Sequence, residues 1–122
     1  MNPLVKEIWV KALKSNKYRK GSGRLRRFAY LKGEQDLFCV IGVLCDLYAE
    51  VGPERWQLSL SAGGYSFDGE SENVPVAVQK WAGLSSEIPV VRYKNRKMAL
   101  TYLNDNEELS FEALAELIEK QL

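Results

Sequence analysis

The sequence predicts a single α+β domain over residues 1–122, in which terminal helices and two β-hairpins pack around a buried central helix. Three observations lead to this prediction. Apolar residues recur at helical spacing near both ends of the chain, an eight-residue apolar run spans Leu37 to Leu44, and two pairs of strand-like segments flank polar turns. Helices and hairpins follow one another without a regular βαβ alternation, which favours the α+β class. A chain of 122 residues has the size of one domain.

The first predicted helix spans residues 3–15. Asn2 is a good N-cap, and Pro3 suits the first helical turn. Residues 15–23 are polar and contain glycines, which is typical of a turn or loop, and residues 25–31 alternate loosely enough for a short strand. The apolar face of the helix recurs at helical spacing and comprises Leu4, Val5, Ile8, Trp9, Ala12 and Leu13.

The second predicted helix, residues 36–50, is apolar nearly all round, which indicates a buried helix with Asp36 as its cap. A buried strand is the alternative, because the run contains the β-branched residues Val40, Ile41 and Val43. The helix is favoured because the pattern continues through residue 51 and stops at Gly52-Pro53.

The second half of the chain carries two hairpin patterns and two helix patterns. Residues 56–60 and 65–67 form the first predicted hairpin, and residues 88–93 and 98–102 form the second around the turn 94–97. A short helix runs from residue 75 through Trp81, with Gly83 as its C-terminal cap. Ser110 caps the final predicted helix.

The composition excludes several classes of chemistry. The chain has no histidine, which excludes Ser-His-Asp and Cys-His catalysis and histidine-dependent metal sites. It has no Gly-rich phosphate or dinucleotide loop. We therefore expect no enzyme, no catalytic residue, no metal and no cofactor. The N-terminal segment lacks the pattern of a signal peptide, and no apolar run is long enough to span a bilayer, so we expect a cytoplasmic protein.

The two cysteines, Cys39 and Cys45, are predicted to be free thiols in a reducing compartment. If their segment is regular, they lie too far apart for a disulfide. With Asp36 as cap, Cys39 would sit in the first turn of a helix, where a thiol is activated. The apolar neighbours favour core packing for both cysteines instead.

Basic residues are concentrated near the N-terminus. Nine of the seventeen Lys and Arg residues fall between Lys11 and Lys32, and no Asp or Glu interrupts them. Such clustering is often retained for an anionic partner. The candidate partner-binding residues are Lys17, Tyr18, Arg19, Lys20, Arg24, Arg26 and Arg27.

Three interpretations of this basic segment remain open. It is a solvated loop without a partner, a site for an acidic protein surface or a phosphate-bearing ligand, or a nucleic-acid surface. Backbone N–H groups at Gly21-Ser22-Gly23 would suit phosphate, and Tyr18 would suit stacking on a base. The sequence pI of 7.7 is low for a dedicated nucleic-acid domain.

Acidic residues are segregated as well. The segment from Asp105 to Glu119 holds six acids and no base, and the segment from Glu34 to Glu72 holds eight acids against Arg55 alone. These segments would either cover the basic residues within one monomer or pair head to tail in a homo-oligomer. The basic residues of the turn 94–97 are expected to be solvated, with a functional role only if the fold places them beside Arg24 to Arg27.

Several segments of the chain resemble small proteins encoded by bacteriophages and prophages. The block Phe38-Cys-Val-Ile-Gly-Val-Leu-Cys-Asp-Leu47 is similar to their signature Cys-Cys-Leu-Gly-Val-Leu-Cys-Asp-Leu, with Val40 in place of the second Cys. The resemblance implies a phage accessory protein and no mechanism. The other matching segments are Lys17–Gly21, Leu25-Arg26, Val78–Leu84, Leu103–Asp105 and Phe111–Ile118.

The function predicted from these observations is non-catalytic. We expect a phage-type accessory protein that binds a host component through the basic segment, with inhibition of a host process or defence system as the sharper form. A nucleic-acid-binding protein using the same segment is the alternative, and a small enzyme using Cys39 is the second. Replacing Arg24, Arg26 and Arg27 with Glu is expected to abolish binding and to leave the fold intact.

Overall fold

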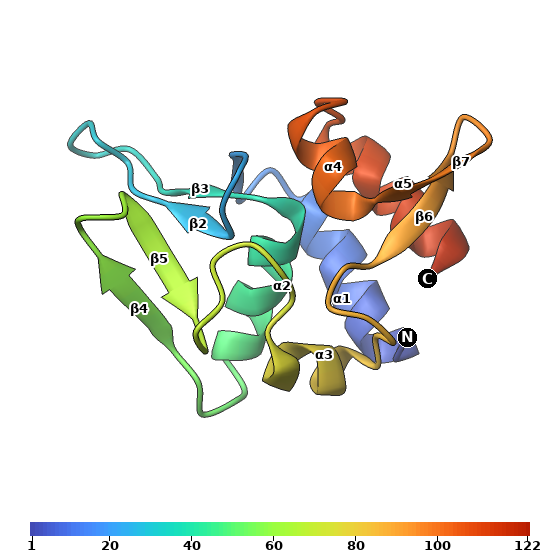
Figure 1. Cartoon of the computed structure of the whole chain (residues 1–122), viewed down its shortest axis with the longest axis horizontal. Helices are drawn as coiled ribbons and strands as arrows, with labels where there is room; N and C mark the ends of the chain where they lie inside the picture. Colours follow the sequence, from blue (N-terminus) through green and yellow to red (C-terminus); the bar gives the residue numbers. More distant parts are fainter.

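The central helix of the fold separates a β-sheet from a pair of helices. The computed structural model describes residues 1–122 and forms one α+β domain, which confirms the predicted class. In Figure 1 the larger sheet lies on one side of the central helix, and the first and last helices lie on the other. The helices are α1 (Pro3–Lys14), α2 (Val40–Ala49), α3 (Val76–Ala82), α4 (Leu100–Asp105) and α5 (Phe111–Gln121).

Short strands make up both sheets. The five-stranded sheet has the order β1-β3-β2-β5-β4, in which β1 pairs with β3 in parallel and all other pairs are antiparallel. The second sheet is the β6–β7 hairpin. The strands are β1 (Arg19–Lys20), β2 (Arg26–Arg27), β3 (Leu37–Phe38), β4 (Trp56–Ser59), β5 (Gly64–Phe67), β6 (Val90–Tyr93) and β7 (Arg96–Ala99).

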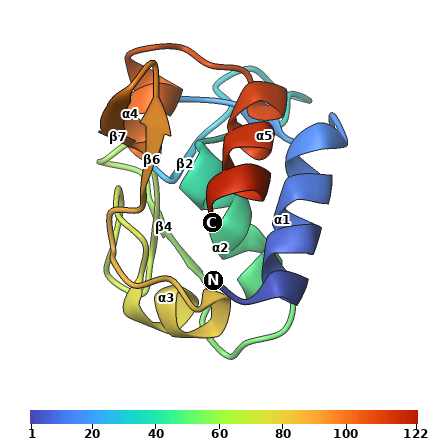
Figure 2. The same ribbon diagram turned by 90° about the vertical axis from the view of Figure 1, so that its right-hand side faces the viewer.

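The terminal helices form as their caps predict. The Asn2 Oδ1 atom accepts from the backbone N–H of Leu4 at 2.8 Å, and the Ser110 Oγ atom accepts from that of Ala113 at 3.1 Å. Figure 2 shows α1 and α5 side by side in front of α2, with both chain ends nearby. Trp9 of α1 is fully buried, and its indole N–H donates to the Val40 carbonyl at 3.0 Å. This hydrogen bond ties α1 to the start of α2.

Helix α2 begins later than predicted. Cys39, not Asp36, is its N-cap, because residues 37 and 38 pair as β3 with strands on both sides. Within the helix, the backbone at Gly42 lies so close to the Leu25 carbonyl that a Cβ atom there would come within 1.8 Å of that oxygen. The glycine therefore lets the segment before β2 pack directly on the helix.

The second hairpin differs from the prediction in the bounds of its turn and of its second strand. Lys94 and Asn95 both have positive φ and form a two-residue turn, so Arg96 and Lys97 belong to β7 and not to the turn. Residues 100–102, predicted as strand, begin α4, because Leu100 and Leu103 bury the same side of a helical turn. The first hairpin and the short helix ending at Gly83 are close to their predicted ranges.

Candidate binding site

The structure brings together four of the seven candidate residues. They line one hollow of about 400 Å³ on the larger sheet, which we call the Arg26 hollow. The other three candidates point elsewhere. The residues lining the hollow are Lys17, Tyr18, Arg19, Arg26, Gln35, Asp36, Phe38 and Asp46.

Arg26 lies at the centre of this site and is covered by an acidic residue of the same chain, Asp36. Its Nε and Nη2 atoms donate to Asp36 Oδ2 at 3.0 and 2.8 Å, and both side chains are only about one fifth exposed. The guanidinium carbon also lies 4.1 Å from the centre of the Tyr65 ring, 5.1 Å from that of Phe38 and 5.4 Å from that of Trp56. Contacts of this kind attract a cation to the ring face.

The Asp36 carboxylate accepts a further hydrogen bond, which fixes its orientation. Its Oδ1 atom accepts from the Ala29 N–H at 2.9 Å. Burial by itself would raise the pKa of Asp36, but the Ala29 N–H and the Arg26 guanidinium outweigh burial and lower it. Asp36 is therefore ionised at neutral pH and holds Arg26 in one orientation.

Asp46 organises the other wall of the hollow from α2. Its two carboxylate oxygens accept from the Tyr18 hydroxyl at 2.7 Å and from the Trp56 indole N–H at 3.0 Å. Burial, and then the hydrogen bond to Asp46, raise the pKa of Tyr18, so the phenol remains a donor. The Tyr18 ring meets Phe38 edge to face, with centroids 5.0 Å apart. Tyr18 is thus half-buried and not free to stack on a ligand.

The exposed cations of this site are at its rim. Lys17 is exposed and forms no ion pair. Arg19 donates to Glu34 Oε2 at 2.9 Å and to the Gln35 carbonyl at 3.3 Å. An exposed pair of this kind contributes at most about 1 kcal/mol, so Arg19 exchanges partners at little cost.

The three remaining candidates bind backbone carbonyls of the same chain. Lys20 Nζ donates to Asn104 at 2.7 Å, Arg24 Nη2 to Tyr65 at 3.2 Å, and Arg27 Nε to Ser22 at 2.6 Å. None of these three cations lines the Arg26 hollow, and each is hydrogen-bonded within the chain, so their role in partner binding stays a prediction.

Gly21, the first residue of the glycine segment 21–23, is hydrogen-bonded within the fold. The Gly21 N–H donates to the Phe38 carbonyl at 2.8 Å, and the Gly21 carbonyl accepts from the side chain of Asn104 at 2.9 Å. Asn104 is fully buried and also accepts from the Val40 N–H at 3.1 Å. These bonds join the segment to α2 and α4. The predicted use of Gly21 in a phosphate cradle is therefore wrong.

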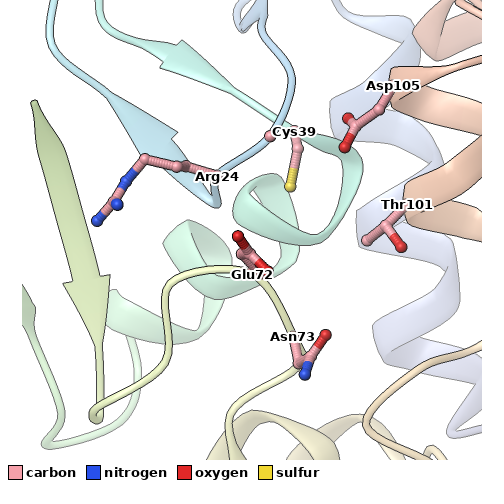
Figure 3. Close-up of a pocket in the computed structure, with 7 residues that line it drawn as sticks. Arg24, Cys39, Glu72, Asn73, Thr101 and Asp105 are labelled. Carbon is pink, nitrogen blue, oxygen red and sulfur yellow. The ribbon is translucent and has the colours of Figure 1, made fainter. Parts of the chain in front are cut away.

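A second, smaller hollow of about 190 Å³ is lined by Cys39 (Figure 3). The Cys39 thiol is 3% exposed, caps α2 by accepting from the Gly42 N–H at 3.4 Å, and has a pKa raised by burial to about 11. Cys39 is thus the N-cap and not a first-turn residue, and its burial agrees with the core packing that its apolar neighbours favoured. In Figure 3 the Arg24 guanidinium points away from the hollow. The other lining residues are Gly23, Glu72, Asn73, Thr101 and Asp105.

The Asp46 carboxylate that binds Tyr18 and Trp56 was not predicted from the sequence. Asp46 is the only acidic residue inside the apolar run of α2, and Trp56 stands at the start of a strand; each is a local signal of a polar group on a buried element. That Asp46 accepts from both Tyr18 and Trp56 has no local signal. Cys45 is fully buried, as expected for a core residue.

The class of protein is thus an α+β domain with a mixed-charge hollow on its sheet. Nowhere in the chain do three or more Cys, Asp or Glu side chains lie close enough together to hold a metal ion. No helix is both long enough and apolar enough to cross a membrane.

Comparison with known proteins identifies the family. A family model described as "Domain of unknown function (DUF8296)" matches residues 1–122, and the chain belongs to this family. No curated protein and no solved structure matches the chain.

Proposed function

We propose that this chain is a non-catalytic, phage-type accessory protein that binds a host protein by receiving an acidic side chain at the Arg26 hollow. The convergence of Lys17, Arg19 and Arg26 on one hollow carries the proposal. Arg26 is held rigid by Asp36 and three aromatic rings, while Lys17 and Arg19 remain exposed at the rim. A pre-arranged cation with adjustable neighbours suits a carboxylate on a partner surface.

The lining of the hollow favours a polypeptide over a phosphate-bearing ligand. Asp36 and Asp46 belong to the same lining, and their repulsion is about twice as large for a phosphate dianion as for a single carboxylate. A protein surface meets such a mixed lining with an acidic side chain beside hydrogen-bond donors. The engaged Gly21 N–H removes one backbone donor that would have supported phosphate.

The two alternatives have less support in the geometry. A nucleic acid on this surface would need a ring that is free to stack, whereas the half-buried Tyr18 ring packs on Phe38. A cysteine enzyme would need a thiolate at neutral pH, and burial of Cys39 opposes it.

The resemblance to phage proteins supplies the setting of the proposal. The partner is a component of the bacterial cytoplasm, and the sharper form of the function is inhibition of a host process or defence system. A second copy of this chain is an alternative partner, since the acidic segment 105–119 offers carboxylates of the required kind.

Charge reversal at the rim tests the proposal. The tagged chain is used to capture proteins from bacterial lysate, and the affinity for the captured protein is measured by calorimetry. We expect the double variant Lys17→Glu, Arg19→Glu to weaken binding at least about tenfold, because both favourable contacts become repulsive. The matched control, Lys80→Glu with Lys120→Glu, changes the net charge equally at exposed sites away from the hollow. Equal binding by the rim variant and the control would overturn the proposal.

A further inference from the structure

A second cationic surface lies at the far end of the molecule from the Arg26 hollow. The hairpin formed by β6 and β7, residues 90–99, projects from the body beside α4 and α5 (Figure 1). Four of its side chains are exposed cations, and none of them takes part in any of the three ion pairs of the chain. They are Arg92, Lys94, Arg96 and Lys97.

The arrangement of these cations works against the stability of the hairpin. Arg92 and Lys97 are directly opposite one another in the strand register, so two like charges share one face. Lys94 occupies a left-handed backbone conformation, φ 51°, at a turn position that favours Gly or Asn. An anionic partner relieves the repulsion, which gives the cluster a physical role.

The edge of β7 adds an aromatic group to this surface. A hollow of about 450 Å³ lies along it and is lined by Arg96, Lys97, Met98, Ala99, Tyr102 and Glu107. Tyr102 of α4 is 48% exposed there, although it is a large aromatic side chain. Glu107 is the one acidic residue of the lining. The hollow therefore presents an accessible ring beside two free cations.

We infer that the β6–β7 hairpin and Tyr102 bind single-stranded nucleic acid. The cations contact successive phosphates, and a base stacks on the Tyr102 ring in the hollow. An unpaired base offers its flat face for stacking, which a duplex does not. The opposite edge of the hairpin is closed, because the Gln121 side chain hydrogen-bonds both backbone groups of Arg92, at 2.6 and 2.8 Å. The nucleic acid therefore lies along the β7 edge of the hairpin.

Fluorescence anisotropy of a labelled oligothymidylate of about 15 nucleotides with the full chain tests this inference. The triple variant Arg92→Gln, Arg96→Gln, Lys97→Gln is expected to bind at least about tenfold more weakly, with a salt slope smaller by about 2, since each phosphate contact on a single strand contributes about 0.7. Circular dichroism checks that the variant is folded. The matched control, Lys11→Gln, Lys32→Gln, Lys80→Gln, removes the same charge at exposed sites away from the hairpin and is expected to bind as the wild type does.

Tyr102 is tested separately from charge. Tyr102→Ala is expected to weaken binding several-fold at an unchanged salt slope, and Tyr102→Phe to retain it, because stacking needs the ring and not the hydroxyl. Any of three results overturns the inference. They are no binding by the wild type at low salt, equal or tighter binding of the same strand as a duplex, and displacement of the labelled oligonucleotide by polyglutamate as effective as displacement by the unlabelled oligonucleotide. The inference does not depend on the Arg26 hollow, so the Lys17→Glu, Arg19→Glu variant is expected to bind the oligonucleotide normally.

Discussion

Arg26 combines two interactions that are weak on an open surface and stronger when partly buried. Its ion pair with Asp36 is mostly shielded from water, and its guanidinium also contacts three rings. Replacing it with Glu, which the sequence alone suggested would leave the fold intact, would place two carboxylates together. The residue is therefore as much a part of the packing of the sheet as of the proposed binding site.

We predict that Arg26→Gln lowers the free energy of unfolding by roughly 1–3 kcal/mol, because Asp36 loses its ionic partner in a partly buried site. Urea denaturation measures the change. The control is Arg19→Gln, whose exposed pair with Glu34 should contribute at most about 1 kcal/mol. Equal losses in the two variants would show that Arg26 is no better anchored than a surface residue.

The ionisation of Asp36 makes the free energy of unfolding depend on pH. Its pKa is lower in the folded chain than the ordinary value of 3.8, so the stability that it contributes is fully present above that value and is lost as the pH falls through the lower pKa. Urea midpoints of the wild type and Asp36→Asn, measured from about pH 6 down to about pH 2, test this linkage. We expect the advantage of the wild type to shrink toward the acid end; an advantage independent of pH would contradict it.

Helix α2 is the element on which both sides of the molecule pack. It carries Asp46 to the Arg26 hollow, and its N-terminus receives Trp9 from α1 and Asn104 from α4. Its position against the segment before β2 depends on Gly42, where the Leu25 carbonyl leaves no room for a side chain. A change in this one contact therefore moves the sheet relative to the helices.

Gly42→Ala tests the close approach of Leu25, because helix propensity and steric overlap predict opposite changes in stability. Helix propensity alone would stabilise α2 by about 1 kcal/mol. Because the new Cβ atom would overlap the Leu25 carbonyl, we expect destabilisation of roughly 3 kcal/mol or more, measured by thermal or urea unfolding. The comparison is Gly69→Ala, where nothing lies within 4 Å and positive φ alone should cost about 1–2 kcal/mol. A stabilised Gly42→Ala variant would disprove the close approach.

The whole molecule has one continuous core with α2 at its centre, and the sheet loops extend away from it. Local opening requires little energy where few side chains are buried. The loop between β2 and β3 is such a place, since Tyr30 is 83% exposed and residues 30–35 are all exposed. The fold thus joins a well-packed centre to lightly packed loops.

We predict that the rates of amide hydrogen exchange differ between the packed centre and the exposed loop. We expect the amides of α2 to exchange most slowly, at rates set by global unfolding, and those of residues 30–34 to exchange fastest. Mass spectrometry of exchanged peptides resolves the two segments. Fast exchange in α2 under native conditions would mean that the central helix is not the most stable element.

Much of the architecture was predictable because its signals are local. Caps and apolar periodicity specify α1 and α5, and Gly83 ends α3 with a left-handed residue. The two-residue strands β1 and β3 were missed because their pairing, Arg19 with Leu37, joins segments without local alternation. Helix α4 was missed because a single buried turn resembles a continued strand.

The basic composition of residues 17–27, the absence of histidine and the buried character of α2 follow from the amino-acid sequence, because each is a property of a short segment or of the whole composition. Which cations remain free was decided by the tertiary structure. Asp36 pairs with Arg26, and Asp46 binds Tyr18, across separations of 10 and 28 residues. Electrostatic and hydrogen-bond energies depend on distances in space, and only the folded chain determines those.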